Sequence, residues 1–257
     1  MKKIYFSLFT LLCSFVQMSC VNDLAMNDTA SREGKFLLSL LAENVETEDI
    51  TRNSEFSVDV NSFKVSLRDQ NGVTLYSGKE YGQLTDADRT LPAGENYQIA
   101  VESCSSTDAE TANEGWGQAR FSAETTFDIV TDQTTPLTLN CVLENAGLML
   151  VFDNSFTTKF PIYAATTQDA RSLVFKAANA GSVAYYNADA ETVSIPLQLT
   201  GSKGGWEDRI NVKKDIAISK GKITRLTVKY DENSGNLDIE FGTDTDMGES
   251  SDDVTIQ

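Results

Sequence analysis

Apolar and polar residues alternate with a period of two along most of this chain, and that pattern limits the fold more than any other feature. Such a period gives a strand one apolar and one polar face, as in antiparallel sheets packed on one side. Turn sequences such as Asp69-Gln70-Asn71-Gly72 and Leu91-Pro92-Ala93-Gly94 separate the runs. The sequence therefore predicts an all-β protein, with alternating runs that include residues 36–41, 56–60, 63–67, 97–101, 137–143, 148–152, 193–199, 223–230 and 237–241.

The number of alternating runs predicts two domains. More than a dozen short strands favour two tandem antiparallel β-sandwich domains over one. The segment Glu144-Asn145-Ala146-Gly147 is charged, contains a glycine and is the expected junction. We therefore predict an N-terminal β-sandwich over residues 34–145 and a C-terminal β-sandwich with an acidic tail over residues 146–257. Short helices are expected only within residues 84–89 or 155–160.

The N-terminus has the pattern of an export signal. Lys2 and Lys3 precede an apolar run over residues 4–16, which is shorter than the roughly 20 residues that a membrane-spanning helix needs. We therefore predict a signal peptide over residues 1–19. The pair Ser19-Cys20 resembles the lipobox of bacterial lipoproteins, whose cysteine is acylated, although Gln17 stands where leucine is usual. An ordinary cleaved signal, with Cys20 uninvolved, is the alternative. Residues 21–33 are mostly small and polar and nearly free of bulky apolar residues, so we predict a flexible lipidated tether over residues 20–33.

Composition excludes several classes of function. The formal charge of −17 repels phosphate backbones, so we expect no nucleic-acid partner. The sequence contains no histidine, which excludes histidine general bases, Ser-His-Asp triads and the commonest zinc sites. The acidic residues between Asp244 and Asp253 do not have the spacing of a helix-loop-helix calcium site, and a solvated tail is favoured. We therefore expect that the protein is not an enzyme and that it has neither a cofactor nor a metal site.

Two cysteines and two tryptophans leave alternatives open. Cys104 and Cys141 lie in apolar alternating runs, and export permits a disulfide between them, but two buried free thiols fit equally well. Trp116 and Trp206 are flanked by glycines, and an exposed tryptophan on a loop could stack on a sugar ring. A tryptophan anchored on its own core is the plainer alternative. These tryptophans motivate an alternative function, that of a monomeric glycan-binding surface lipoprotein.

Several stretches in a fixed order carry a resemblance to a known family. The opening run Gly34-Lys35-Phe36-Leu37-Leu38-Ser39-Leu40 is followed by a polar stretch that ends at Arg52, then by Leu91-Pro92-Ala93-Gly94 and by the loop around Trp116. Residues 137–146 lead into residues 148–152, and Gly221-Lys222-Ile223-Thr224 precedes a last hairpin around Gly235. In this order they resemble the fimbrillin-like surface lipoproteins of Bacteroidales bacteria, and in particular a branch catalogued as a domain of unknown function.

The resemblance implies a fold, a location and a way of assembly. Such proteins have two transthyretin-like β-sandwich domains and lie at the outer membrane and cell surface, where they form pili or act as accessory, anchor or tip components in adhesion. In the pilins of the family the first strand is a placeholder, which a protease removes by cutting after an arginine beyond it. A strand from another subunit then fills the groove, as in other β-strand additions.

Transferred to this sequence, the resemblance assigns roles to specific residues. Phe36, Leu38 and Leu40 belong to the placeholder strand, with Leu37 and Leu41 on its other face. Arg52 is the predicted cleavage site, and Val254 and Ile256 form the tip of a donor strand. The implied partners are other pilus subunits, identical or related, the outer membrane through lipid on Cys20, and an unidentified host or polysaccharide ligand.

Each of these roles has a plainer alternative. Residues 36–41 also fit an ordinary core strand. Arg52 also fits a solvated arginine in a loop. Arg32 is a second arginine, but cutting there would leave the first strand in place. Val254 and Ile256 equally fit a last edge strand of the protein's own second domain.

Overall fold

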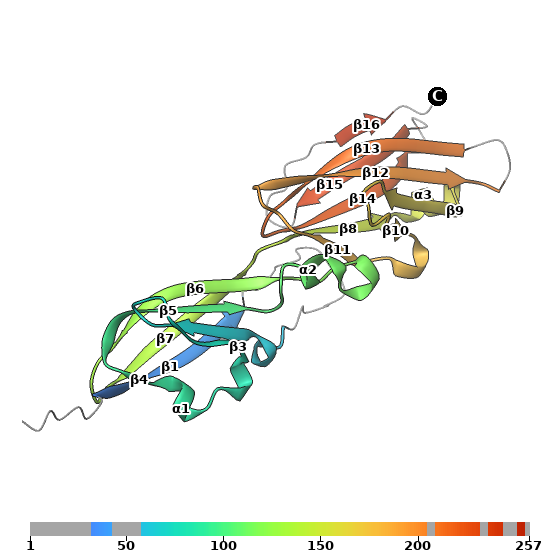
Figure 1. Cartoon of the computed structure of the whole chain (residues 1–257). Helices are drawn as coiled ribbons and strands as arrows, with labels where there is room; N and C mark the ends of the chain where they lie inside the picture. The colour runs from blue at the N-terminus through green and yellow to red at the C-terminus, as the bar shows by residue number, and fades with distance from the viewer. Residues whose placement is uncertain (1–31, 43–57, 205–208, 232–235, 244–250, 255–257) are drawn as a thin grey trace, which may run out of the picture.

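The computed structural model describes residues 32–42, 58–204, 209–231, 236–243 and 251–254 (Figure 1). These residues form strands joined by turns and short helices, so the predicted all-β class is confirmed. None of the helices in this described part of the chain has the length and apolar character needed to cross a bilayer.

The first seven strands form one sheet that folds over on itself. The sheet has the order β3-β2-β5-β6-β7-β1-β4. Strands β6 and β7 pair only where Phe121 lies opposite Leu143 and Ser122 opposite Val142, and then separate. The two parts of the sheet therefore face each other and share one core. The strands are β1 (Glu33–Ala42), β2 (Lys64–Arg68), β3 (Thr74–Glu80), β4 (Thr90–Pro92), β5 (Gly94–Glu102), β6 (Phe121–Ile129) and β7 (Thr134–Leu143).

The period-two alternation produces this first core. In β2, in β5 from Tyr97 and in β7 from Leu139, every second side chain is buried, while its neighbours are half-buried or exposed. The inward residues pack with aromatic rings from β1 and β6, and the rings of Phe36 and Phe127 lie 5.2 Å apart. We call the described residues up to Leu143 the N-terminal unit.

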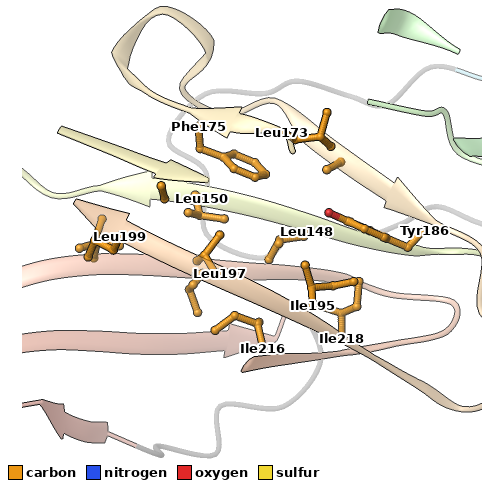
Figure 2. Packing of buried hydrophobic residues seen from close by; sticks show 14 of the residues in the cluster. Leu148, Leu150, Leu173, Phe175, Tyr186, Ile195, Leu197, Leu199, Ile216 and Ile218 are labelled. Atoms are coloured by element: carbon orange, nitrogen blue, oxygen red, sulfur yellow. The ribbon is translucent and has the colours of Figure 1, made fainter. Parts of the chain in front are cut away.

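The remaining strands form two sheets around a second core. The four-stranded sheet has the order β10-β9-β12-β13, and the five-stranded sheet has the order β11-β8-β14-β15-β16. Figure 2 shows Leu148 and Leu150 of β8 packed against Leu197 of β12 and Ile216 of β13. We call this part, from Ala146 onward, the C-terminal unit. Its strands are β8 (Ala146–Phe152), β9 (Ile162–Thr167), β10 (Val174–Phe175), β11 (Val183–Tyr186), β12 (Thr192–Ser202), β13 (Arg209–Ser219), β14 (Ile223–Asp231), β15 (Asn236–Thr243) and β16 (Ser251–Val254).

The chain passes from one core to the other over two residues. Leu143 at the end of β7 belongs to the first core, and Ala146 at the start of β8 belongs to the second. Glu144 and Asn145 lie between them, within the segment expected as the junction. Figure 1 shows the two units arranged end to end.

Short helices occupy the connections. Helix α1 (Asp86–Arg89) lies within the predicted segment 84–89, and α3 (Asn154–Lys159) overlaps the predicted segment 155–160 but begins one residue earlier. Helix α2 (Asp108–Thr111) and the 3₁₀ helices η1 (Val60–Ser62), η2 (Tyr81–Gln83), η3 (Asn113–Gly115) and η4 (Ala177–Asn179) are not predicted.

The prediction of a strand over residues 56–60 is wrong for residues 58–60, which the structure describes. The carboxylate of Asp59 accepts a hydrogen bond of 3.0 Å from the backbone N–H of Asn61. This contact caps η1 and turns the chain before β2 begins.

Candidate functional site

The first strand, β1, has two different faces. The side chains of Phe36, Leu38 and Leu40 are only 1%, 3% and 7% exposed, and they point into the first core. Leu37 and Leu41 point outward and are each 56% exposed. A strand of this kind supplies apolar side chains to the core at every second position, and its outer face stays open to water.

Backbone pairing holds β1 mainly along one edge. On one side it runs parallel to β7 over eight residue pairs, from Lys35 opposite Thr134 to Ala42 opposite Cys141. On the other side it is antiparallel to β4 over only three pairs, between Glu33 and Lys35. From Phe36 to Ala42, the strand therefore has a ladder partner along one edge only among the residues that the structure describes.

Side chains from a connection approach the other edge of β1. The hydroxyl of Tyr81, in η2, donates a hydrogen bond of 2.9 Å to the backbone carbonyl of Leu38. The ammonium of Lys35 lies 3.6 Å from the carboxylate of Asp86, but both side chains are largely exposed, so this ion pair adds little. Within the described ranges, the hydrogen bond from Tyr81 lies on that edge beyond Lys35, where no neighbouring strand pairs with β1.

The start of β1 fits closely against the turn between β6 and β7. A Cβ atom on Gly34 would lie 2.2 Å from the carbonyl oxygen of Val130 and 2.9 Å from a methyl carbon of Ile129. A side chain at this position would force the strand away from the turn. Gly34 therefore fixes how closely β1 approaches the rest of the unit.

The burial of the three inward side chains determines how much free energy β1 contributes to the stability of the N-terminal unit. Burying a Phe or Leu side chain contributes about 1.5–3 kcal/mol relative to leaving it in water. If β1 departed without a replacement, it would uncover the apolar surface that Phe127 and the neighbouring core residues present to Phe36. A replacing strand would need apolar side chains at alternate positions and backbone groups free to pair with β7.

Several residues singled out in the sequence lie outside the described part of the structure. They are Cys20, Arg52, Trp206 and Ile256. Arg32 is described and exposed, and its backbone carbonyl accepts a hydrogen bond of 2.6 Å from Ala93. Val254 ends β16, where it lies opposite Leu237 of β15. That pairing is the arrangement expected of an edge strand in the protein's own sheet.

Trp116 packs on the protein itself. Its half-buried ring meets that of Phe175 edge-on, with centroids 4.9 Å apart and an angle of 78° between the planes. It lies in the connection between β5 and β6 of the N-terminal unit, yet it packs against the second core. This is the anchored alternative from the sequence.

The cysteines and acidic residues offer no reactive centre among the residues that the structure describes. Cys104 and Cys141 are both buried free thiols, so the structure contains no disulfide between them. Burial raises the pKa of Cys141 to about 11, which keeps its thiol protonated at neutral pH. In the described ranges, no three residues of the metal-binding types His, Cys, Asp and Glu gather into a site.

Comparison with known families identifies the chain's relatives. A family model described as "Domain of unknown function (DUF4493)" matches residues 32–257. The chain belongs to this family. The match confirms the predicted membership of a branch catalogued as a domain of unknown function. No curated protein sequence matches the chain.

Several solved structures of bacterial proteins are similar to this chain over most of its length. A fimbrial assembly protein from Parabacteroides distasonis is 11% identical, with a TM-score of 0.46 over 86% of this chain and 98% of that one. A candidate cell adhesion protein from Bacteroides ovatus is 10% identical, with a TM-score of 0.43 over 87% and 98% of the two chains. The fimbrial anchor protein Mfa2 from Porphyromonas gingivalis is 12% identical, with a TM-score of 0.35 over 81% and 97%.

Proposed function

We propose that this protein is a cell-surface, fimbrillin-like component of a pilus that assembles by β-strand addition at the position of β1. The observation that carries the proposal is the asymmetry of that strand. Phe36, Leu38 and Leu40 fill the core, yet in the described part of the chain the backbone from Phe36 onward has a ladder along one edge only. Such a strand contributes much to the core, and its backbone is held mainly by the ladder to β7 on one edge.

The order of the chain suits removal of β1 together with the lipid. Cys20 precedes the strand and Arg52 follows it, before β2 begins at Lys64. In our proposal, cutting after Arg52 separates the lipid, the tether and β1 from the remaining strands. A strand from another subunit then pairs with β7 and fills the core. A subunit that keeps β1 acts instead as an anchor or tip.

The alternative of a monomeric glycan-binding protein has less support. It depends on a tryptophan whose face is free for a sugar, whereas the ring of Trp116 packs against Phe175. Trp206 lies outside the described residues, so a role for it in glycan binding stays a prediction. The prediction that the protein is not an enzyme likewise rests on the sequence, which has no histidine.

Limited proteolysis with an arginine-specific protease tests the proposal. The exported body, starting at residue 21, is incubated with the protease and analysed by intact mass and by gel electrophoresis without boiling. We expect a cut after Arg52, followed by oligomers from which the fragment containing β1 is missing. The matched variant Arg52→Lys keeps the charge and removes the cleavage site, so it should stay monomeric. If the parent protein is not cut at Arg52, or is cut and forms no oligomer, the polymerising role is wrong.

A further inference from the structure

We propose that a clamp centred on Arg171 locks the N-terminal and C-terminal units into one rigid body, so that the junction does not act as a hinge. This inference concerns the joint between the units and does not depend on the proposed role of β1. Its evidence is a set of hydrogen bonds and apolar contacts that cross the two-residue connection.

Arg171 lies in the C-terminal unit and reaches carbonyl groups of both units. Its Nη1 donates to the carbonyl of Tyr185 at 2.7 Å and to that of Gly115, in the N-terminal unit, at 3.1 Å. A longer contact of 3.4 Å leads to the carbonyl of Glu110 in the same connection. The guanidinium therefore joins β11 to the long connection between β5 and β6.

Further contacts hold the guanidinium in place. Its carbon lies 3.8 Å from the centre of the Tyr186 ring, a cation–π arrangement, and its Nε lies 3.5 Å from the carboxylate of Asp169. The side chains of Arg171 and Asp169 are only 18% and 23% exposed, so water screens this pair less than a surface pair. The planar guanidinium presents Nη1 to the carbonyl groups and Nε to Asp169 at the same time, an arrangement that the single nitrogen of a lysine ammonium does not reproduce.

The same connection covers the edge of the five-stranded sheet. Strand β11 is the outer strand of that sheet, and its Tyr185 N–H donates to the carbonyl of Trp116 at 2.8 Å. Just beyond β11, the N–H of Asn187 donates to the carboxylate of Glu110 at 2.9 Å, and its amide side chain donates to the carbonyl of Ser106 at 2.8 Å. Backbone and side chains of the N-terminal unit therefore bond to this edge of the C-terminal unit.

A second polar contact lies at the connection itself. Asn145 is only 1% exposed, and its side chain accepts from the N–H of Arg120 at 3.1 Å and donates to the carbonyl of Gln118 at 2.8 Å. The carbonyl of Asn145 accepts from the N–H of Gly221 at 3.0 Å. One buried residue thus bonds to both units.

Apolar side chains complete the joint. Ile223 opens β14 of the C-terminal unit, but its side chain, 4% exposed, belongs to the first core. Met149 and Val183 pack against the same core. Relative motion is the default for two units in one chain unless the surface between them is extensive and apolar. Here bending would expose Ile223 and break the bonds of Arg171 and Asn145, so we infer a fixed angle.

Distances between spin labels test the clamp directly. Labels are placed on Thr126→Cys in the N-terminal unit and Ala217→Cys in the C-terminal unit, both exposed positions, while the native thiols are buried. Double electron–electron resonance then gives the distribution of distances between the units. We expect one narrow distribution for the parent, and a distribution about twofold wider for Arg171→Ala once the clamp is lost. Arg171→Lys should also widen the distribution, because it keeps the charge but one ammonium does not reach both the carbonyl groups and Asp169.

A control and a second variant keep the test decisive. Arg68→Ala removes the same charge from an exposed position on β2 and should leave the distribution narrow. If Arg171→Ala fails to fold by circular dichroism, Asn187→Ala removes only the bond to Ser106 and should widen the distribution to a smaller extent. A broad distribution in the parent, or an unchanged width in folded Arg171→Ala, would overturn the proposal.

Discussion

The hydroxyl of Tyr81 donates a 2.9 Å hydrogen bond to the backbone carbonyl of Leu38, 43 residues earlier in the chain. The bond lies on the edge of β1 where strand β4 pairs only as far as Lys35. It is therefore one of the few polar contacts that hold this edge, and its loss should affect β1 before the rest of the unit.

Replacing Tyr81 by phenylalanine removes this bond and keeps the ring. The free energy of unfolding should fall by about 1 kcal/mol, because a buried carbonyl loses a partner. Hydrogen exchange measured by mass spectrometry should show faster exchange in peptides from β1. Tyr163→Phe, in the C-terminal unit, is the control and should leave exchange in β1 unchanged. Equal exchange in β1 for parent and Tyr81→Phe would show that the bond contributes nothing.

The two faces of β1 should respond differently to alanine. Leu38→Ala opens a cavity in the first core and should cost about 2–5 kcal/mol of unfolding free energy. Leu37→Ala removes an exposed side chain of the same size from the next position and should change stability by about 0.5 kcal/mol or less. Urea denaturation measures both. Similar losses for the two variants would contradict the burial of Leu38.

Gly34→Ala should loosen the start of β1. The added methyl would overlap the carbonyl of Val130, so either the strand or the turn must move, at a cost of about 1–3 kcal/mol. Thermal unfolding and hydrogen exchange of β1 measure the effect. Ser39→Ala, an exposed change in the same strand, serves as the control and should be near neutral. A Gly34→Ala protein as stable as the parent would show that the turn gives way without cost.

The buried Cys141 thiol should make stability fall at high pH. Its folded pKa of about 11 lies above the unfolded value, so the unfolded chain releases its proton first as the pH rises. This contribution is fully present below the unfolded pKa, about 8.5, and is lost as the pH rises toward 11. Urea denaturation at several pH values measures it, and Cys141→Ala should remove this part of the pH dependence. A contribution of Cys141 that stays constant over this range would contradict the raised pKa.

The free state of the two cysteines gives a separate prediction. The body starting at residue 21 contains only Cys104 and Cys141, which are buried free thiols. A thiol reagent at pH 8 should find neither in the native protein and both in urea, without added reductant. If no thiol reacts with the reagent in urea, the two cysteines form a disulfide, which would contradict the structure.

The local alternation of apolar and polar residues predicts which face of a strand is buried, but it does not predict which strands pair with each other. The period of two places Phe36, Leu38 and Leu40 on one face, and Asn71-Gly72 lies in the turn between β2 and β3, because both depend on neighbours in sequence. That β1 lies parallel to β7 depends on contacts about a hundred residues apart, which no local pattern encodes. The prediction fails over residues 58–60, where the side chain of Asp59 caps a turn of 3₁₀ helix and competes with strand formation.

The residues that hold the site and the joint were not identifiable from sequence. Tyr81 and Arg171 lie in polar segments, where a tyrosine or arginine is usually solvated. Their importance comes from the carbonyl groups that they reach in distant segments. The glycines beside Trp116 are visible in the sequence, but their reason is structural: Gly117 has a φ of +75°, and a Cβ atom there would lie 2.3 Å from the carbonyl oxygen of Ala109.

Native mass spectrometry of the protein cut after Arg52 tests the central claim most directly. It reports whether the fragment that contains β1 stays bound and how many subunits associate. We predict that the mass of this fragment disappears from the complex as subunits join, because a strand from a neighbour takes the place of Phe36, Leu38 and Leu40. A cut protein that stays monomeric and retains the fragment would contradict the account and would leave β1 as an ordinary core strand.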